Sequence, residues 1–219
     1  MTNLDPPPTD PLDVATVATP GRPRDAAIDD AVMESALTLL DENGPGPLSI
    51  DAIAAHAGVS KASIYRRWDS KGDVLIDAIN SLAGDVEEPD TGAIRSDLIR
   101  IVGSLTHFMS DARAGSLLPW LVGEIAAGSE MGIRYLETVI MPRRAMMSRV
   151  IDGAVDRGDL RIDLDVAVAV DMLIGPLVVG KLTRSAELSN PMRHAVLVDT
   201  LLAGWTPVPT STPPDRVTN

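Results

Sequence analysis

The side chains with the most distinctive chemistry follow one another in the sequence SKASIYRRWDSK. Lys61, Ser63 and Tyr65 can donate hydrogen bonds, and Arg66 and Arg67 add further donors with positive charge. Phosphate oxygens and the edges of nucleic-acid bases accept such bonds. The chemistry that this cluster could perform is therefore recognition of a nucleic acid.

Two short helices joined by a glycine turn are expected to position these side chains. Ser49 is typical of a helix N-cap, and an apolar stripe at helical spacing follows it. Gly58 ends this helix, because glycine adopts the positive φ that often closes one. Ser60 then caps a second helix, whose Ile64 and Trp68 should point into the core. This pattern is typical of a helix-turn-helix element, which reads the DNA major groove from the start of its second helix.

Further basic residues extend the predicted DNA-binding surface at both ends. Arg22 and Arg24 precede a helix predicted at residues 25–43 and could form an arm that contacts phosphates or the minor groove. The alternative for this arm is a solvated N-terminus. Lys71 begins a helix that Ser70 caps, although the helix dipole favours anions at this position. A bound phosphate would account for the lysine.

Composition restricts the remaining possibilities. The chain has 219 residues, of which 45% are hydrophobic, so it can bury a sizeable core. Its net charge of −12 argues against a protein that coats nucleic acid non-specifically, but is compatible with a few placed contacts. It has no cysteine and no run of about 18 uncharged apolar residues, so neither disulfides nor a transmembrane helix are predicted. Its N-terminus does not resemble a signal peptide, and we expect a cytoplasmic protein.

Helical periodicity predicts an all-α protein with two domains and about nine helices. Residues 21–84 would form an N-terminal three-helix helix-turn-helix domain that binds DNA. Residues 91–205 would form a larger helical domain for ligand binding and dimerisation. The proline-rich tails at residues 1–20 and 206–219 are predicted to be disordered.

Helices predicted at residues 163–184 and 190–204 are the candidates for dimerisation. The first is apolar on nearly every side, and such a helix must be buried on every side. We therefore expect residues 163–204 to pack against the same residues of a second copy. The alternative is that they form the centre of a monomeric bundle.

The string AGVSKASIYRRWDSK, with GRPR and a glycine-rich helix end before it, resembles the TetR family of bacterial transcriptional regulators over about residues 21–83. After that, the resemblance is carried mainly by residues 157–160 and the apolar helix that follows. It implies an all-helical dimer that binds a near-palindromic operator and is released by a small molecule in the C-terminal domain.

By position, the resemblance implies phosphate contacts for Ser49 and Lys71 and recognition-helix roles for residues 61–63 and 65. Some family members place a base-reading cation near Asp51, so this chain is expected to read bases mainly from the third helix and the arm. The complete predicted DNA-contacting set is Arg22, Arg24, Ser49, Ser60, Lys61, Ala62, Ser63, Tyr65, Arg66, Arg67 and Lys71.

An effector cavity is expected among helices at residues 93–110, 116–127, 130–157 and 163–184. Pro142 should break the third of these near residues 139–141. Few charges fall inside the predicted cavity, so we expect a largely apolar effector. Candidate lining residues, each of which could equally fill the core, are His107, Met109, Trp120, Met131, Tyr135, Met141, Met146 and Met172.

An enzyme is not expected. The histidines at 56, 107 and 194 lie on different predicted helices, and no nucleophile–base string, HExxH motif or phosphate-binding loop is present. No cofactor and no metal site is predicted. The alternative to a DNA-binding regulator is a helical ligand-binding or interaction module of the same fold with weak or no sequence-specific DNA binding. The acidic charge of residues 21–83 keeps that alternative open.

Overall fold

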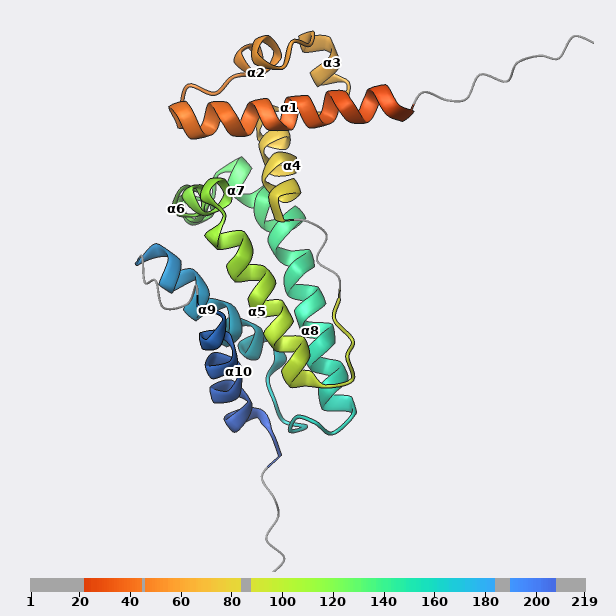
Figure 1. Ribbon diagram of the computed structural model, residues 1–219, viewed down its shortest axis with the longest axis vertical. Helices are drawn as coiled ribbons and strands as arrows, with labels where there is room; N and C mark the ends of the chain where they lie inside the picture. Colours follow the sequence, from red (N-terminus) through yellow and green to blue (C-terminus); the bar gives the residue numbers. More distant parts are fainter. Residues whose placement is uncertain (1–21, 45, 84–87, 184–189, 208–219) are drawn as a thin grey trace, which may run out of the picture.

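The protein is described here from a computed structural model, in which the described residues are 22–44, 46–83, 88–183 and 190–207. Every regular element within these ranges is a helix, which confirms the predicted all-α class (Figure 1). Both predicted tails lie outside the described residues, apart from Thr206 and Pro207.

The elements have the following bounds: α1 (Arg22–Asn43), α2 (Ile50–Ala57), α3 (Lys61–Tyr65), α4 (Lys71–Ala83), α5 (Ile94–Ser110), α6 (Ala112–Ala126), α7 (Glu130–Tyr135), the π-helical segment η1 (Leu136–Ile140), α8 (Met141–Asp156), α9 (Val166–Leu182) and α10 (Pro191–Trp205).

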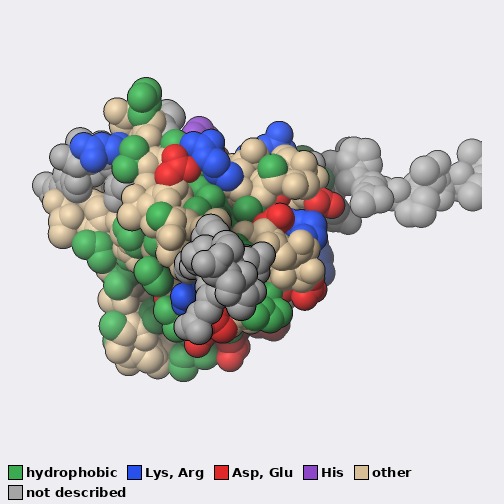
Figure 2. Space-filling view, turned by 90° about the horizontal axis from the view of Figure 1, so that it is seen from below, with side chains coloured by type: hydrophobic (Ala, Val, Ile, Leu, Met, Phe, Trp, Pro, Cys, Tyr) green, Lys and Arg blue, Asp and Glu red, His purple; other side chains and the backbone are tan. Residues whose placement is uncertain are grey.

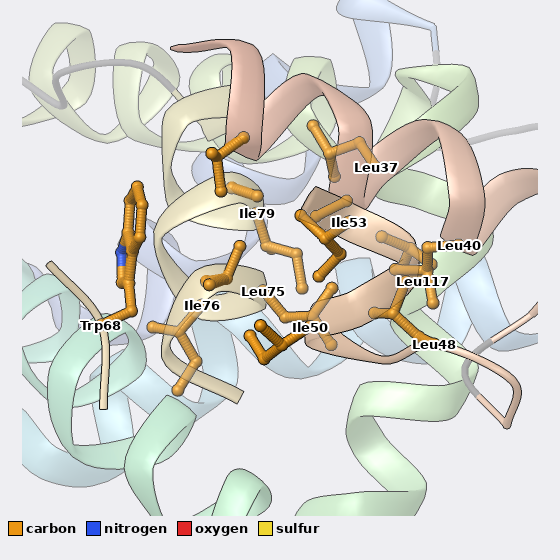
Figure 3. Packing of buried hydrophobic residues seen from close by; sticks show 14 of the residues in the cluster. Leu37, Leu40, Leu48, Ile50, Ile53, Trp68, Leu75, Ile76, Ile79 and Leu117 are labelled. Carbon is orange, nitrogen blue, oxygen red and sulfur yellow. The ribbon is translucent and has the colours of Figure 1, made fainter. Parts of the chain in front are cut away.

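The four N-terminal helices surround a buried hydrophobic cluster that extends into the C-terminal part of the chain. Helix α1 lies across one end of the molecule, with α2 and α3 beyond it and α4 running back towards the other helices (Figure 1). Leu117 of α6 lies beside Leu40 and Leu48 in this cluster (Figure 3). Tyr135 and Val139 also belong to it. We call this group the first cluster.

A second cluster fills the space among α5, α8, α9 and α10. Helices α5 and α8 run along each other, and α9 and α10 lie against them on one flank (Figure 1). Leu98, Ile151 and Leu173 are fully buried there. Phe108 packs against both clusters, so the two meet where α5 passes α6.

The long helix predicted at residues 130–157 is interrupted as expected. Helix α7 passes into η1, and α8 begins at Met141 with Pro142 in its first turn. Proline has no backbone N–H and its ring collides with the preceding helical turn, so a regular helix cannot continue unchanged through it. The wider π-helical turn absorbs this defect.

Three predicted helix starts differ from the structure. Helix α1 begins at Arg22, so the backbone of residues 22–24 is helical and does not form a separate arm; their side chains are not described. Helix α6 begins at Ala112, because Asp111 caps it through backbone N–H groups, and Pro119 therefore lies in its interior. Helix α9 is capped by Asp165 and begins at Val166.

Candidate nucleic-acid interface and interior cavity

Side-chain caps set the geometry of α2 and α3. Ser49 Oγ accepts a hydrogen bond from the Ala52 N–H at 3.2 Å, and Gly58 closes α2 with a φ of +67°. Ser60 Oγ accepts from the Ser63 N–H at 3.2 Å and so begins α3. Such caps satisfy backbone donors that have no partner inside the helix. The predicted helix-turn-helix element is present with the predicted caps.

The outer face of α3 carries the side chains that the sequence singled out. Lys61, Ala62 and Arg66 are exposed, and Tyr65 is 55% exposed. Ile64 and Trp68 point the other way and are buried, and the Trp68 indole N–H donates to Asp77 Oδ2 at 2.8 Å. A five-residue helix is thus held by two buried anchors and leaves its polar face free for a partner.

Arg67 takes a different position from the other predicted DNA contacts. Its guanidinium forms an ion pair with Asp29 of α1 and donates to the Ser63 carbonyl at 3.0 Å. Only 15% of its side chain is exposed. Arg67 therefore links α3 to α1, and we remove it from the set of candidate DNA contacts.

The two lysines of this region already have protein partners. Lys61 Nζ lies 2.5 Å from Asp51 Oδ1, and hydrogen bonding to this carboxylate raises the pKa of the Lys61 ammonium. Both side chains are more than half exposed, and ion pairs of this kind add little stability, so Lys61 can exchange partners. Lys71 Nζ donates to the Leu48 carbonyl at 3.0 Å, which holds its ammonium beside the start of α2.

The start of α4 has the predicted capping arrangement. The Ser70 N–H donates to Asp73 Oδ2 at 3.0 Å, and the Asp73 N–H donates back to Ser70 Oγ at 3.3 Å. This reciprocal capping box satisfies donors at the first turn. Lys71 therefore projects from a well-defined helix start.

A cavity of about 210 Å³ lies among the C-terminal helices. Its wall consists mostly of apolar side chains from α5, α6, α8 and α9, and Ala83 at the end of α4 also contributes. Of the eight predicted lining residues, Met109, Tyr135 and Met146 line this cavity. Leu121 and Tyr135 belong to both the cavity wall and the first cluster.

The other five predicted lining residues do not line this cavity. His107 is exposed, and Met141 and Met172 are 50% and 47% exposed. Trp120 and Met131 pack instead against the first cluster. Spacing along a helix did not reveal which side each residue faces, because that depends on how the helices pack together.

Polar residues in the cavity wall were missed by the sequence analysis. Arg143 and Arg144 of α8 and Ser104 of α5 line it. Arg144 pairs with Asp171, with Nη1 and Oδ1 2.6 Å apart. Arg143 donates to Asn80 Oδ1 at 2.8 Å and to the Val139 carbonyl at 3.2 Å. One feature of the sequence could have drawn attention to the two arginines. They directly follow Pro142 at the start of a helix, where the helix dipole disfavours cations.

Other features of the described residues add no further site. His56 is exposed and its Nδ1 lies 3.0 Å from Ser35 Oγ, while His194 is buried with Nε2 3.0 Å from Thr106 Oγ1. Within the described ranges, no group of three or more His, Asp or Glu residues could hold a metal ion. None of the described helices is both long and apolar enough to cross a membrane.

Comparison with protein-family models assigns both parts of the chain. Residues 32–78 match the model for bacterial regulatory proteins of the tetR family. Residues 88–201, more than half of the chain, match the model for the tetracycline repressor-like C-terminal domain. The chain belongs to the TetR family. Like other members of this family, it is a DNA-binding transcriptional regulator and not an enzyme.

Individual relatives agree with this assignment to the TetR family. The chain is 32% identical over 171 residues to the HTH-type transcriptional regulator YdeS of Bacillus subtilis, covering 78% of this chain and 86% of YdeS. It is 30% identical over 178 residues to the DNA-binding transcriptional repressor TetR of Mycobacteroides abscessus, covering 78% and 90%. The crystal structure of the TetR family regulator SCO0332 superposes with a TM-score of 0.63 at 29% identity, covering 82% of this chain and 99% of that one.

Proposed function

We propose that the chain is a dimeric repressor that binds a two-fold DNA operator through α3 and leaves it when a largely apolar small molecule fills the cavity. The observation that carries this proposal is the polar outer face of α3, which is held in place by Ile64 and Trp68 and left exposed. The M. abscessus relative is a repressor, which favours repression over activation.

The proposed DNA contacts fall into two groups, those to base edges and those to phosphates. Lys61 and Ser63 lie in the first turn of α3, the part of a recognition helix that enters the major groove, and are assigned to base edges. Tyr65, Ser49 and Lys71 are assigned to phosphates, which fix the position of the protein on DNA. The bond from Lys71 to the Leu48 carbonyl supports this, because it keeps the ammonium next to Ser49.

A second copy of the chain is proposed to cover the outer faces of α9 and α10. Val168, Met172 and Val179 of α9 and Met192 and Val196 of α10 are each about half exposed or more. Figure 2 shows hydrophobic side chains on the surface at the left, the side on which α9 and α10 lie in Figure 1. Exposed apolar patches mark interaction sites. A symmetric pair suits a two-fold operator, and such a repressor would act in the cytoplasm.

The small-molecule part of the proposal relies on the cavity. Aliphatic, methionine and phenylalanine side chains dominate its wall, which suits a largely apolar molecule. Because Ala83 of α4 and the first-cluster residues Leu121 and Tyr135 are part of that wall, a bound molecule would press on the helices that support α3.

Operator binding provides the test. Fluorescence anisotropy with DNA from upstream of the chain's own gene should show a salt-dependent complex. We expect Lys71→Ala to weaken binding about tenfold and to reduce the slope of log affinity against log salt by about one. The control is Arg100→Ala at an exposed position of α5, outside the predicted DNA-binding and dimer surfaces, which should leave DNA affinity unchanged.

Unchanged affinity in the Lys71→Ala protein would remove the phosphate assignment. If the unaltered protein forms no complex even at low salt, the chain would instead be a ligand-binding or interaction module of the same fold. Sedimentation of the protein alone tests the dimer separately.

A further inference from the structure

We propose that the cavity binds a compact amphipathic carboxylic acid, with its carboxylate against Arg143 and Tyr135 and its apolar body among the aliphatic and methionine side chains. This inference rests on the proposed function, because it specifies the chemical class of the effector for the same cavity. It adds an acidic end to the largely apolar molecule of that proposal.

Arg143 is the first reason. Arg143 lines the cavity and is half-buried, and the hydrogen-bond acceptors of its guanidinium are Asn80 Oδ1 and the Val139 carbonyl, which are both neutral. No carboxylate of the described residues pairs with it, whereas the neighbouring Arg144 is neutralised by Asp171. Burial lowers the pKa of Arg143, which reflects the cost of keeping an unpaired charge away from water. A carboxylate in the cavity would offset that cost and use the remaining guanidinium donors.

Tyr135 is the second reason. The residue is 2% exposed and lines the cavity, and its hydroxyl makes no hydrogen bond to any described residue. A tyrosine hydroxyl can donate one hydrogen bond, so this one is available to a bound molecule. Burial raises the pKa of the Tyr135 hydroxyl, so it stays protonated at neutral pH and can donate. Tyr135 and Arg143 both line the cavity and are close enough for their charges to interact.

The size of the cavity limits the apolar body. A dry apolar cavity of about 150 Å³ is known to hold benzene. The cavity here, of about 210 Å³, has room for a somewhat larger molecule, such as a substituted benzoic acid or a medium-chain fatty acid. Ile101, Leu118 and Ile174 come from different helices and surround this space.

Arg143 also connects the cavity to the DNA-binding part of the chain. Its hydrogen bond to Asn80 joins α8 to α4, the helix that follows α3. A carboxylate that binds the remaining guanidinium donors would pull on Arg143 and so on its contact with Asn80. Binding of the ligand's acidic end would therefore alter the contact between α8 and α4.

The experiment compares acids with matched neutral amides on the full-length protein without DNA. Calorimetry would measure the affinities of 4-ethylbenzoate, 4-ethylbenzamide, octanoate and octanamide at neutral pH. We expect at least one acid to bind at least tenfold tighter than its amide. Arg143→Gln should abolish this preference, and Tyr135→Phe should reduce it. Arg149→Gln, which alters an arginine of the same helix outside the cavity wall, should preserve it.

The outcomes separate this inference from the proposed function. Equal or tighter binding of the amides, or no binding of any of the four compounds, would overturn it. So would an Arg143→Gln protein that still prefers an acid. If that variant does not fold, Arg143→Lys replaces it and should retain part of the preference. Operator binding is measured separately. If the acids fail these tests while the protein still binds its operator, only the carboxylate proposal is refuted and the proposed function stands.

Discussion

The two hydrophobic clusters differ in what they hold together. The second cluster lies among α5, α8, α9 and α10, which are all in the C-terminal part of the chain. The first cluster joins the DNA-binding helices α1–α4 to Leu117, Tyr135 and Val139 of α6, α7 and η1. The DNA-binding part is therefore packed against the C-terminal part through the same cluster that holds its own helices together. A change in the cavity wall can reach α3 through side-chain packing.

Polar contacts reinforce the same junction. Arg113 of α6 donates two hydrogen bonds to Glu34 of α1, at 2.8 and 2.7 Å. Arg134 of α7 pairs with Asp73 of α4. Among the helices of the second cluster, the bidentate pair of Arg95 and Asp199 joins α5 to α10, both in the C-terminal part of the chain. The polar contacts at the junction thus connect the DNA-binding helices to the C-terminal part, whereas the pair of Arg95 and Asp199 connects two helices within the C-terminal part.

Disrupting the contact between α6 and α7 should have the largest effect. A Cβ atom on Gly132 of α7 would lie 2.3 Å from the Glu124 carbonyl oxygen and 2.6 Å from the Ile125 nitrogen. These are backbone atoms of α6, so the two helices must move apart. We expect Gly132→Ala to lower the free energy of unfolding by about 3 kcal/mol, as measured by denaturant titration.

Gly123→Ala is the matched control in α6. A Cβ atom there meets nothing within 4 Å, and alanine favours the helix, so stability should rise by about 0.5–1 kcal/mol. If the two variants lost similar stability, close packing of α7 against α6 would not be a major contribution to the stability of the protein.

Substitutions of Arg66 and Arg67 should have different effects, one on DNA affinity and the other on the stability of the protein. Arg67→Ala leaves Asp29 of α1 without its ion-pair partner and should cost about 1–2 kcal/mol of stability. Arg66→Ala removes an exposed side chain and should leave the melting temperature nearly unchanged while weakening the DNA complex. Thermal melts and anisotropy on the same preparations check both expectations. A destabilised Arg66→Ala protein with an unaffected Arg67→Ala protein would reverse the two roles.

The helix-turn-helix element could be predicted from sequence because its determinants are local. Ser49, Gly58 and Ser60 each act on backbone within a few residues, so residue type and spacing were sufficient. The starts of α1 and α6 were missed by three or four residues. The helix predicted from residue 116 begins at Ala112, because Asp111 caps it.

The cavity could be predicted only in outline because its wall is assembled from distant segments. Met109 and His107 are two residues apart on α5, yet Met109 lines the cavity and His107 faces solvent. Arg143 was not among the predicted lining residues, because the sequence pattern placed few charges in the predicted cavity, and tertiary packing decides which long side chains reach it. Likewise, the ion pair of Arg67 with Asp29 joins residues far apart in sequence, and no local pattern indicates it.

The smallest expected effect concerns the exposed contact between Arg113 and Glu34. Hydrogen bonding to the guanidinium lowers the pKa of the Glu34 carboxyl below its ordinary value of 4.5. A carboxylate with a lowered pKa in the folded state stabilises above its unfolded pKa, and this contribution is lost as the pH falls through the folded value. The Glu34 side chain is 60% exposed, so solvent screening limits the contribution to less than about 1 kcal/mol.

Glu34→Gln tests this contact. The variant should be slightly less stable than the unaltered protein above pH 4.5, and the two curves of stability against pH should converge as the pH falls below that value. Glu42→Gln, at an exposed position of the same helix, is the control and should show no such convergence. If the Glu34→Gln difference stayed constant down to low pH, the ion pair would contribute nothing to the junction. The first cluster would then hold α1 against α6 through apolar packing alone.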